Sequence, residues 1–164
     1  MRKIAFAPIV DANSKILLLG TMPGEESLRK QEYYGHKSNQ FWKILFTLYN
    51  KPLANDYKER VALLLEKKIA LWDVLQSCEG VGSLDSNIKN EQPNDFKKFY
   101  KRYPHIRHIF FTSQKAKQFY VKYVGLDEVH TFSVLPSPSP ANAKMCLSEK
   151  IKSWKEILES MLSL

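Results

Sequence analysis

Short apolar runs alternate along the chain with longer segments in which apolar residues recur every three or four positions. Four of these runs each end at Gly, Asp, Ser or Pro, which predicts short buried strands. They cover residues 15–20, 67–75, 107–113 and 129–137. Residues 5–11 predict a further short strand or an extended arm near the N-terminus.

The segments between and after the runs predict amphipathic helices, because one side of each is apolar. They cover residues 39–50, 55–68, 93–104, 113–124 and 147–164. Asn55-Asp56 are candidate N-caps of the second segment, and Asn94 or Asp95 of the third. The core side of the last segment would consist of Ile151, Trp154, Ile157, Leu158 and Met161.

Strands that alternate with helices favour parallel pairing with right-handed crossovers. The pattern predicts an α/β fold, a three-layer α/β/α sandwich with a central, mostly parallel four-stranded sheet. A length of 164 residues suits a single domain, residues 1–164. In such sheets ligands bind beyond the carboxyl ends of the strands. Four loops therefore matter: residues 20–39, 72–88, 112–115 and 135–142.

The composition is that of an ordinary soluble globular domain, with 44% hydrophobic and 26% charged residues. No apolar run is long enough to span a membrane and no signal peptide is recognisable, so we expect a cytoplasmic protein. Cys78 and Cys146 are expected to be free thiols and are too few for an iron–sulfur cluster. The four histidines show no metal-ligand spacing, so we expect no metal and no cofactor.

The charge balance permits a polyanionic partner without proving one. Lys and Arg number 25 against 17 Asp and Glu, which gives a net charge of +8. Neutralising phosphates with such charges releases counterions and favours binding. A nucleotide-binding enzyme is disfavoured, because Gly20 and Gly24 are followed by no Lys of a phosphate loop and the dinucleotide fingerprint is missing.

The last of the four loops is stiff, because Pro136, Pro138 and Pro140 alternate with two serines. Serine hydroxyls on a stiff loop are suitable donors to phosphate oxygens. An ordinary rigid connector remains an alternative interpretation of this loop alone.

Taken together, five motifs in order resemble the uracil-DNA glycosylase superfamily over nearly the whole chain. The mismatch-specific uracil/thymine branch shares Pro-Gly after the first strand, an aromatic residue followed by H-x-x-N-x-F-W, and a Pro-Ser loop before the last helix. The details are more similar to the hypoxanthine-DNA glycosylase branch. They are "GTMPGEES", "QEYYGHKSNQFW", "ALWDVLQSC", "GSLDSNI" and "LPSPSPANA".

The resemblance implies base flipping, in which one base leaves the duplex and enters a pocket. It puts Tyr34 where relatives have an aromatic ring against the flipped base, a stacking contact of about 1–3 kcal/mol. A Tyr34 folded into the core is the alternative. Gly20 would let the backbone approach the base, and Met22 would lie beside it.

Asp73 falls, by resemblance, where uracil enzymes have an Asn that reads the base edge. Deamination gives a ring nitrogen of adenine or cytosine an N–H that the undamaged base lacks. A carboxylate only accepts hydrogen bonds, so it would accept from that N–H and repel the lone pair of an undamaged base. The alternative is that Asp73 caps the following segment.

Water activation cannot follow the commonest pattern of the superfamily, because Met22 stands where many members have Asp or Asn. A thioether cannot take a proton from water. Asn39 is the candidate catalytic residue and matches the asparagine given this task in the hypoxanthine branch. Asn is no general base near neutral pH, so its contribution would be positioning and electrostatics. His36 would contact the leaving base or a phosphate, or serve the loop structurally.

Phosphates around the extruded nucleotide would be held from two loops. The candidates are Ser137, Ser139, Asn142, Ser86 and Asn87. Asn142 could instead reach the base or the minor groove.

A departure from the hypoxanthine branch follows the third strand, where Thr112-Ser113 replace its usual Asn-Gly. If this loop touches the base, the preferred lesion could differ from the usual one of the branch.

The chain is therefore predicted to be a monofunctional DNA glycosylase of base excision repair, monomeric and nucleoid-associated. Hypoxanthine would be its first substrate and uracil its second. One alternative is a nucleic-acid-binding module that kept the fold and lost catalysis, for which Met22 is the best argument. Another is a hydrolase of free nucleosides, which the positive charge disfavours.

Overall fold

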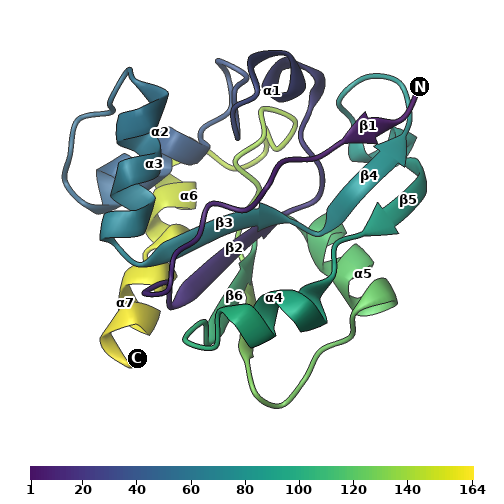
Figure 1. Ribbon diagram of the computed structural model, residues 1–164. Helices are drawn as coiled ribbons and strands as arrows, with labels where there is room; N and C mark the ends of the chain where they lie inside the picture. Colours follow the sequence, from purple (N-terminus) through teal and green to yellow (C-terminus); the bar gives the residue numbers. More distant parts are fainter.

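A four-stranded parallel sheet forms the centre of the computed structural model, which describes residues 1–164 (Figure 1). Its strands are β2 (Ile16–Gly20), β3 (Ile69–Asp73), β6 (His108–Phe111) and β7 (Thr131–Val134). Their spatial order is β3-β2-β6-β7, and every neighbouring pair is parallel. The predicted sheet is confirmed, with all four strands inside the predicted runs.

Helices cover both faces of this sheet, because successive side chains of each buried strand point to opposite sides. Ile16 and Leu18 of β2 pack in the same core as α2 (Phe41–Leu48), α3 (Tyr57–Glu66), α6 (Leu147–Trp154) and α7 (Glu156–Leu162). Leu17 and Leu19 pack in a second core with α4 (Phe96–Arg102) and α5 (Gln114–Tyr123). The three-layer prediction is confirmed.

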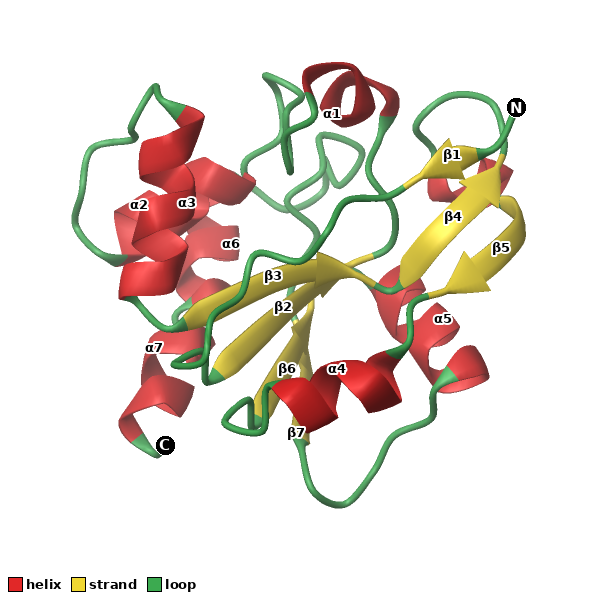
Figure 2. Cartoon of the chain, viewed as in Figure 1, coloured by secondary structure: helices red, strands yellow, loops and turns green.

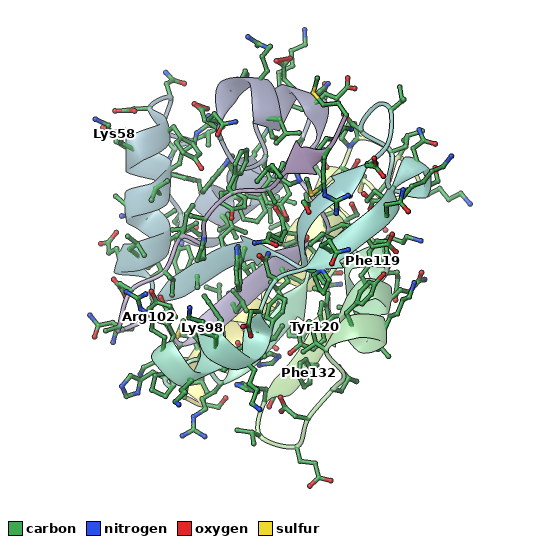
Figure 3. The ribbon with its side chains drawn as sticks, turned by 45° about the vertical axis from the view of Figure 1, so that its right-hand side comes forward. Lys58, Lys98, Arg102, Phe119, Tyr120 and Phe132 are labelled. Atoms are coloured by element: carbon green, nitrogen blue, oxygen red, sulfur yellow. The ribbon has the colours of Figure 1, made fainter.

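Aromatic rings fill much of the second core. Tyr120 of α5 lies with its ring centroid 5.6 Å from that of Phe132 on β7, and Figure 3 shows the two side by side.

Two predicted N-caps are present on helices of this fold. The Asp56 carboxylate accepts from the Lys58 N–H, and the Asp95 carboxylate from the Lys98 N–H. The last predicted helix is divided in two at Lys155.

A second, antiparallel sheet was not predicted from the sequence. It has the order β1-β4-β5, with β1 (Lys3–Ile4), β4 (Leu75–Glu79) and β5 (Lys89–Pro93), and lies at the right of Figure 2. β5 carries only polar residues before its Pro, so no apolar run marks it. The N-terminal strand pairs at Lys3–Ile4, before the range predicted, while Ile9 forms one bridge to Leu71.

The loops that follow the carboxyl ends of the parallel strands lie at one end of the main sheet. From β2 the chain crosses to β3 on one side and later to β6 on the other, so the strand order switches direction at β2. Two short helices that interrupt predicted loops lie at this end, α1 (Glu25–Lys30) and the 3₁₀ turn Asp85–Asn87. None of the helices is both long enough and apolar enough to cross a membrane.

Trp154 anchors the Pro-Ser loop to the core, because its buried indole N–H donates to the Pro136 carbonyl over 2.9 Å. We expect Trp154→Phe to lower the free energy of unfolding by about 2 kcal/mol, since the carbonyl loses its donor and the smaller ring leaves space. Urea unfolding measures this loss. Ser153→Ala, on the exposed side of the same helix, is the control, and an equal loss in both variants would contradict the assignment.

Candidate active site

A cavity of about 710 Å³ opens at the carboxyl ends of the parallel strands. All four predicted loops contribute to its lining. Every site residue predicted from the sequence lines it except Asn87: Gly20, Met22, Tyr34, His36, Asn39, Asp73, Ser86, Ser137, Ser139 and Asn142. The side chain of Asn87 instead donates to the Val81 carbonyl over 2.9 Å and closes its own loop.

Gly20 allows the groups on the floor of the cavity to meet. β2 and β3 pair with Gly20 opposite Asp73, so the two strands end together. A Cβ at position 20 would lie 2.6 Å from Asp73 Oδ1 and 2.9 Å from Tyr34 Oη. Both distances are below van der Waals contact, so only glycine fits this arrangement.

Tyr34 is held rigidly beside Gly20. Its backbone has φ +53°, a left-handed conformation that is uncommon for a residue with a bulky side chain. Its hydroxyl lies 3.0 Å from Thr112 Oγ1, and its ring stacks on Phe41 with a centroid distance of 3.9 Å. Tyr34 thus packs against the core and lines the cavity at once, which combines the two alternatives drawn from the sequence.

Asp73 carries a buried carboxylate without a protein partner. The residue is 4% exposed, and Oδ2 is buried with no hydrogen-bond donor. Its backbone carbonyl accepts from Asn94 Nδ2 over 2.8 Å, which fixes the strand end but leaves the side chain free. The capping alternative is therefore not realised. Burial, and secondarily the charge of Asp85, raises the pKa of Asp73 to about 7.

Asn39 begins the turn that leads into α2. Its side-chain Oδ1 accepts from the Phe41 N–H over 2.9 Å, so the orientation of the amide is fixed and Nδ2 keeps its donors. The next residue, Gln40, donates its N–H to the Pro138 carbonyl over 3.0 Å and accepts from the buried Lys150 ammonium. His36 Nδ1 accepts from the Ser38 N–H, a contact within its own loop.

The Pro-Ser loop is stiffened by its own hydrogen bonds. Ser137 Oγ accepts from the Ser139 N–H, and Ser139 Oγ accepts from the Ala141 N–H, each over 3.2 Å. Asn142 Nδ2 donates to the Ser137 carbonyl. Because both serine oxygens accept here, their hydroxyl protons stay available to an anion in the cavity.

Among the lining residues that were not predicted to belong to the site are Thr21, Asp85, Thr112 and Ser113. The Thr21 hydroxyl donates to Asp85 Oδ2 over 3.3 Å and lies 3.4 Å from Ser113 Oγ. Thr112 Oγ1 contacts the Leu19 carbonyl as well as Tyr34. Two features of the sequence lie at these residues: Thr112-Ser113 differ from the usual Asn-Gly of the hypoxanthine branch, and Asp85 lies within the motif "GSLDSNI". Neither feature predicted a role for Asp85.

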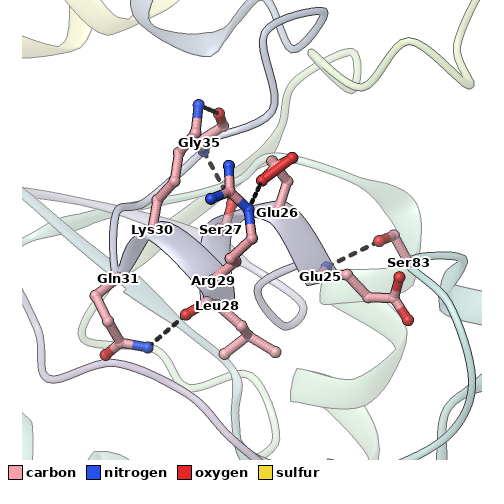
Figure 4. A network of polar contacts seen from close by, with 9 residues as sticks. All are labelled: Glu25, Glu26, Ser27, Leu28, Arg29, Lys30, Gln31, Gly35 and Ser83. Carbon is pink, nitrogen blue, oxygen red and sulfur yellow. Dashed lines mark hydrogen bonds and ion pairs between the residues drawn. The ribbon is translucent and has the colours of Figure 1, made fainter.

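Helix α1 joins two of the lining loops (Figure 4). Ser27 Oγ accepts from the Gly35 N–H over 2.9 Å, and the Lys30 ammonium donates to the Gly35 carbonyl, which fixes the residue after Tyr34. At its other end, the Glu25 N–H donates to Ser83 Oγ, two residues before Asp85. The walls that carry Tyr34 and Asp85 are therefore tied to the same short helix.

Residues 7–161 match the family model "Uracil DNA glycosylase superfamily". The chain belongs to this superfamily. Two relatives, both named Hypoxanthine DNA glycosylase, come from Methanosarcina barkeri and Methanosarcina acetivorans. They are 33% and 34% identical to this superfamily member, covering 95% and 96% of its chain and 98% of each relative.

A solved structure shares the fold. The solution NMR structure of a candidate Uracil DNA glycosylase from M. acetivorans has a TM-score of 0.82 and 32% identity, covering 98% of this chain and 99% of that one. Within the superfamily member described here, no group of three or more His, Cys, Asp or Glu side chains gathers in a way that could hold a metal ion.

Asp73 should make stability depend on pH. Its carboxyl ionises near 3.8 in the unfolded chain and near 7 in the folded protein. Between these values the folded form holds a proton that the unfolded form releases, so the free energy of unfolding falls as the pH rises. Asp73→Asn removes this titration. We expect the variant to gain up to about 4 kcal/mol over the wild type between about pH 4 and pH 8.

Urea unfolding of both proteins across this pH range measures the difference. A difference between the two free energies that stays constant with pH would contradict the raised pKa of Asp73.

Proposed function

We propose that this superfamily member is a monofunctional DNA glycosylase. It hydrolyses the N-glycosidic bond of deaminated bases in DNA, hypoxanthine first and uracil second, and leaves an abasic site. One observation carries the proposal: the partnerless carboxylate of Asp73 lies against Gly20 and Tyr34 at the end of a cavity of nucleotide size. The names and nearly full-length similarity of the two relatives support it.

The state of Asp73 suits the recognition of deaminated bases. A buried polar atom without a partner is unfavourable, and a bound ligand can remove this cost by donating a hydrogen bond. The ring N–H of hypoxanthine or uracil is such a donor, while the bare nitrogen of adenine or cytosine is not. With a pKa of about 7, Asp73 is close to the pH at which it becomes a pure acceptor.

The burial of Asp73 supports base flipping, in which the base leaves the duplex. Asp73 lies at the floor, 4% exposed, where no base within a stack could reach it. A base inserted there would meet Tyr34, whose ring is fixed by Phe41 and Thr112. Because the ring is already ordered in the free protein, stacking on it costs little side-chain entropy.

The remaining groups have roles around the sugar and the phosphates. The fixed amide of Asn39 orients the attacking water. Ser137, Ser139, Asn142 and Ser86 hold the phosphates, and His36, which lines the same cavity, contacts the leaving base or a phosphate. A net charge of +8 favours DNA over a free nucleoside. That the enzyme is a monomer associated with the nucleoid stays a prediction.

The decisive measurement is cleavage of labelled duplexes that each carry one hypoxanthine or one uracil, with alkali to break abasic sites. We expect the wild type to cut both, hypoxanthine faster. Asn39→Ala should bind the duplex but cut at least about 100-fold more slowly, because a positioned group is lost. Asn13→Ala, on an exposed turn, is the control. A wild type that binds without cutting would identify a binding module instead.

Asp73→Asn should relax the selection of the base. An amide can turn its NH₂ group toward the bare N1 of adenine, which a carboxylate repels. We expect the ratio of affinities for hypoxanthine and adenine duplexes to narrow by about tenfold, the equivalent of one hydrogen bond. An unchanged ratio of the two affinities would contradict the reading role of Asp73.

The rate of excision by the wild type should rise as the pH increases through about 7, because Asp73 then loses its proton.

A further inference from the structure

Two other carboxylates line the same cavity as Asp73: Glu26, which pairs with Arg29, and Asp85. Asp85 comes from the loop between β4 and β5, and its exposure is intermediate. A cavity that receives part of a polyanion gains nothing from a second negative charge in binding, because that charge repels phosphates. A carboxylate in this place therefore suggests a role in the reaction and not in affinity.

The surroundings of Asp85 and Asp73 differ. The Thr21 hydroxyl donates to Asp85, and the Lys115 ammonium of α5 is near enough to favour its charged form. The Asp73 carboxylate has no hydrogen-bond donor in the protein and no cation near enough to favour its charged form. The other titratable groups whose charges couple to Asp85 are Asp73, Tyr34 and Cys78. Burial raises the pKa of Asp85, whereas Thr21 and Lys115 oppose that rise.

Asp85 shares the cavity with three other groups that can bind a proton, Asp73, Glu26 and His36, and lies beside one, Met22, that cannot. It lines a small hollow next to the main cavity together with Met22, and both residues line the main cavity too. Neither a thioether nor the amide of Asn39 can accept a proton from water near neutral pH. An ionised carboxylate can, and its charge also stabilises the positive sugar that forms as the base departs.

A purely structural role explains Asp85 poorly, because other contacts hold its loop. Glu25 binds this loop twice, through its N–H to Ser83 Oγ and through its carboxylate to the Gly82 N–H. The Lys3 ammonium donates to the Gly82 carbonyl, and Asn87 closes the turn from within. The side chain of Asp85 adds one hydrogen bond, that from Thr21, at the wall of the cavity.

We propose that Asp85 is a catalytic residue that takes a proton from the attacking water oriented by Asn39. This inference rests on the proposed glycosylase function. The bond between C1′ and the base nitrogen breaks, and its electron pair goes to the base, which takes a proton from solvent. The water oxygen bonds to C1′ while one water proton passes to Asp85. Release of that proton to solvent regenerates the carboxylate, so the net addition is one water.

The test separates turnover from binding. Single-turnover cleavage of a hypoxanthine duplex gives the rate, and a duplex with a 2′-fluoro sugar under hypoxanthine, which resists cleavage, gives the affinity. We expect Asp85→Asn to cut at least about 100-fold more slowly than the wild type. Its affinity should be equal or higher, because a negative charge near the phosphates is lost. Asp56→Asn, which exchanges one good N-cap of α3 for another, is the control.

A small acid provides a second, independent readout. Asp85→Ala leaves space that formate can enter, so sodium formate should raise its rate at least tenfold (about 1.4 kcal/mol) over sodium chloride of equal ionic strength. Asn39→Ala should gain nothing from formate. A misfolded loop would not be repaired by a small anion.

Three results have distinct meanings. An Asp85→Asn rate within about threefold of the wild type would overturn the proposal. So would a parallel loss of affinity and rate without rescue by formate, since that is the behaviour of a structural residue. A wild type that cuts no duplex would overturn the proposed function itself, which is a different failure.

Discussion

The register between β2 and β3 is the constraint on which the site depends. Pairing of Gly20 with Asp73 ends both strands at one level, and the missing side chain at Gly20 leaves room for the Asp73 carboxylate and the Tyr34 hydroxyl. A shift by one residue would reverse which side chains face each core. The same contacts that form the two cores therefore also fix the floor of the cavity.

The floor holds groups that would destabilise an isolated loop. Tyr34 has a left-handed backbone, and Asp73 keeps a buried oxygen without a donor. Such features persist only where surrounding structure enforces them. Here the stacking of Tyr34 on Phe41, which is fully buried at the start of α2, and the parallel ladder of the sheet supply that enforcement. This stored unfavourable energy is available to a ligand that satisfies the carboxylate.

The walls are ordered before any ligand arrives. α1 links the Tyr34 loop to the loop that carries Asp85, and Gln40 links the Asn39 turn to the Pro-Ser loop. In the proposed glycosylase Met22 supplies no base, so the positioning of groups by these ordered walls contributes to the rate. In the proposed mechanism two carboxylates in unlike surroundings have different roles: Asp73 reads the base, and Asp85 accepts a proton from the water.

The sequence by itself determined the main layers, because apolar runs and helical spacing report local burial directly. It also placed the candidate residues at strand ends, and all but Asn87 line the cavity. It missed β5, since that strand is polar and forms only by pairing with β4. Only the tertiary structure revealed Asp85 and Thr112 as part of the site. Asp85 contacts Thr21, and Thr112 contacts Tyr34, across 64 and 78 positions of the sequence. A local sequence pattern cannot predict contacts between residues so far apart in the chain.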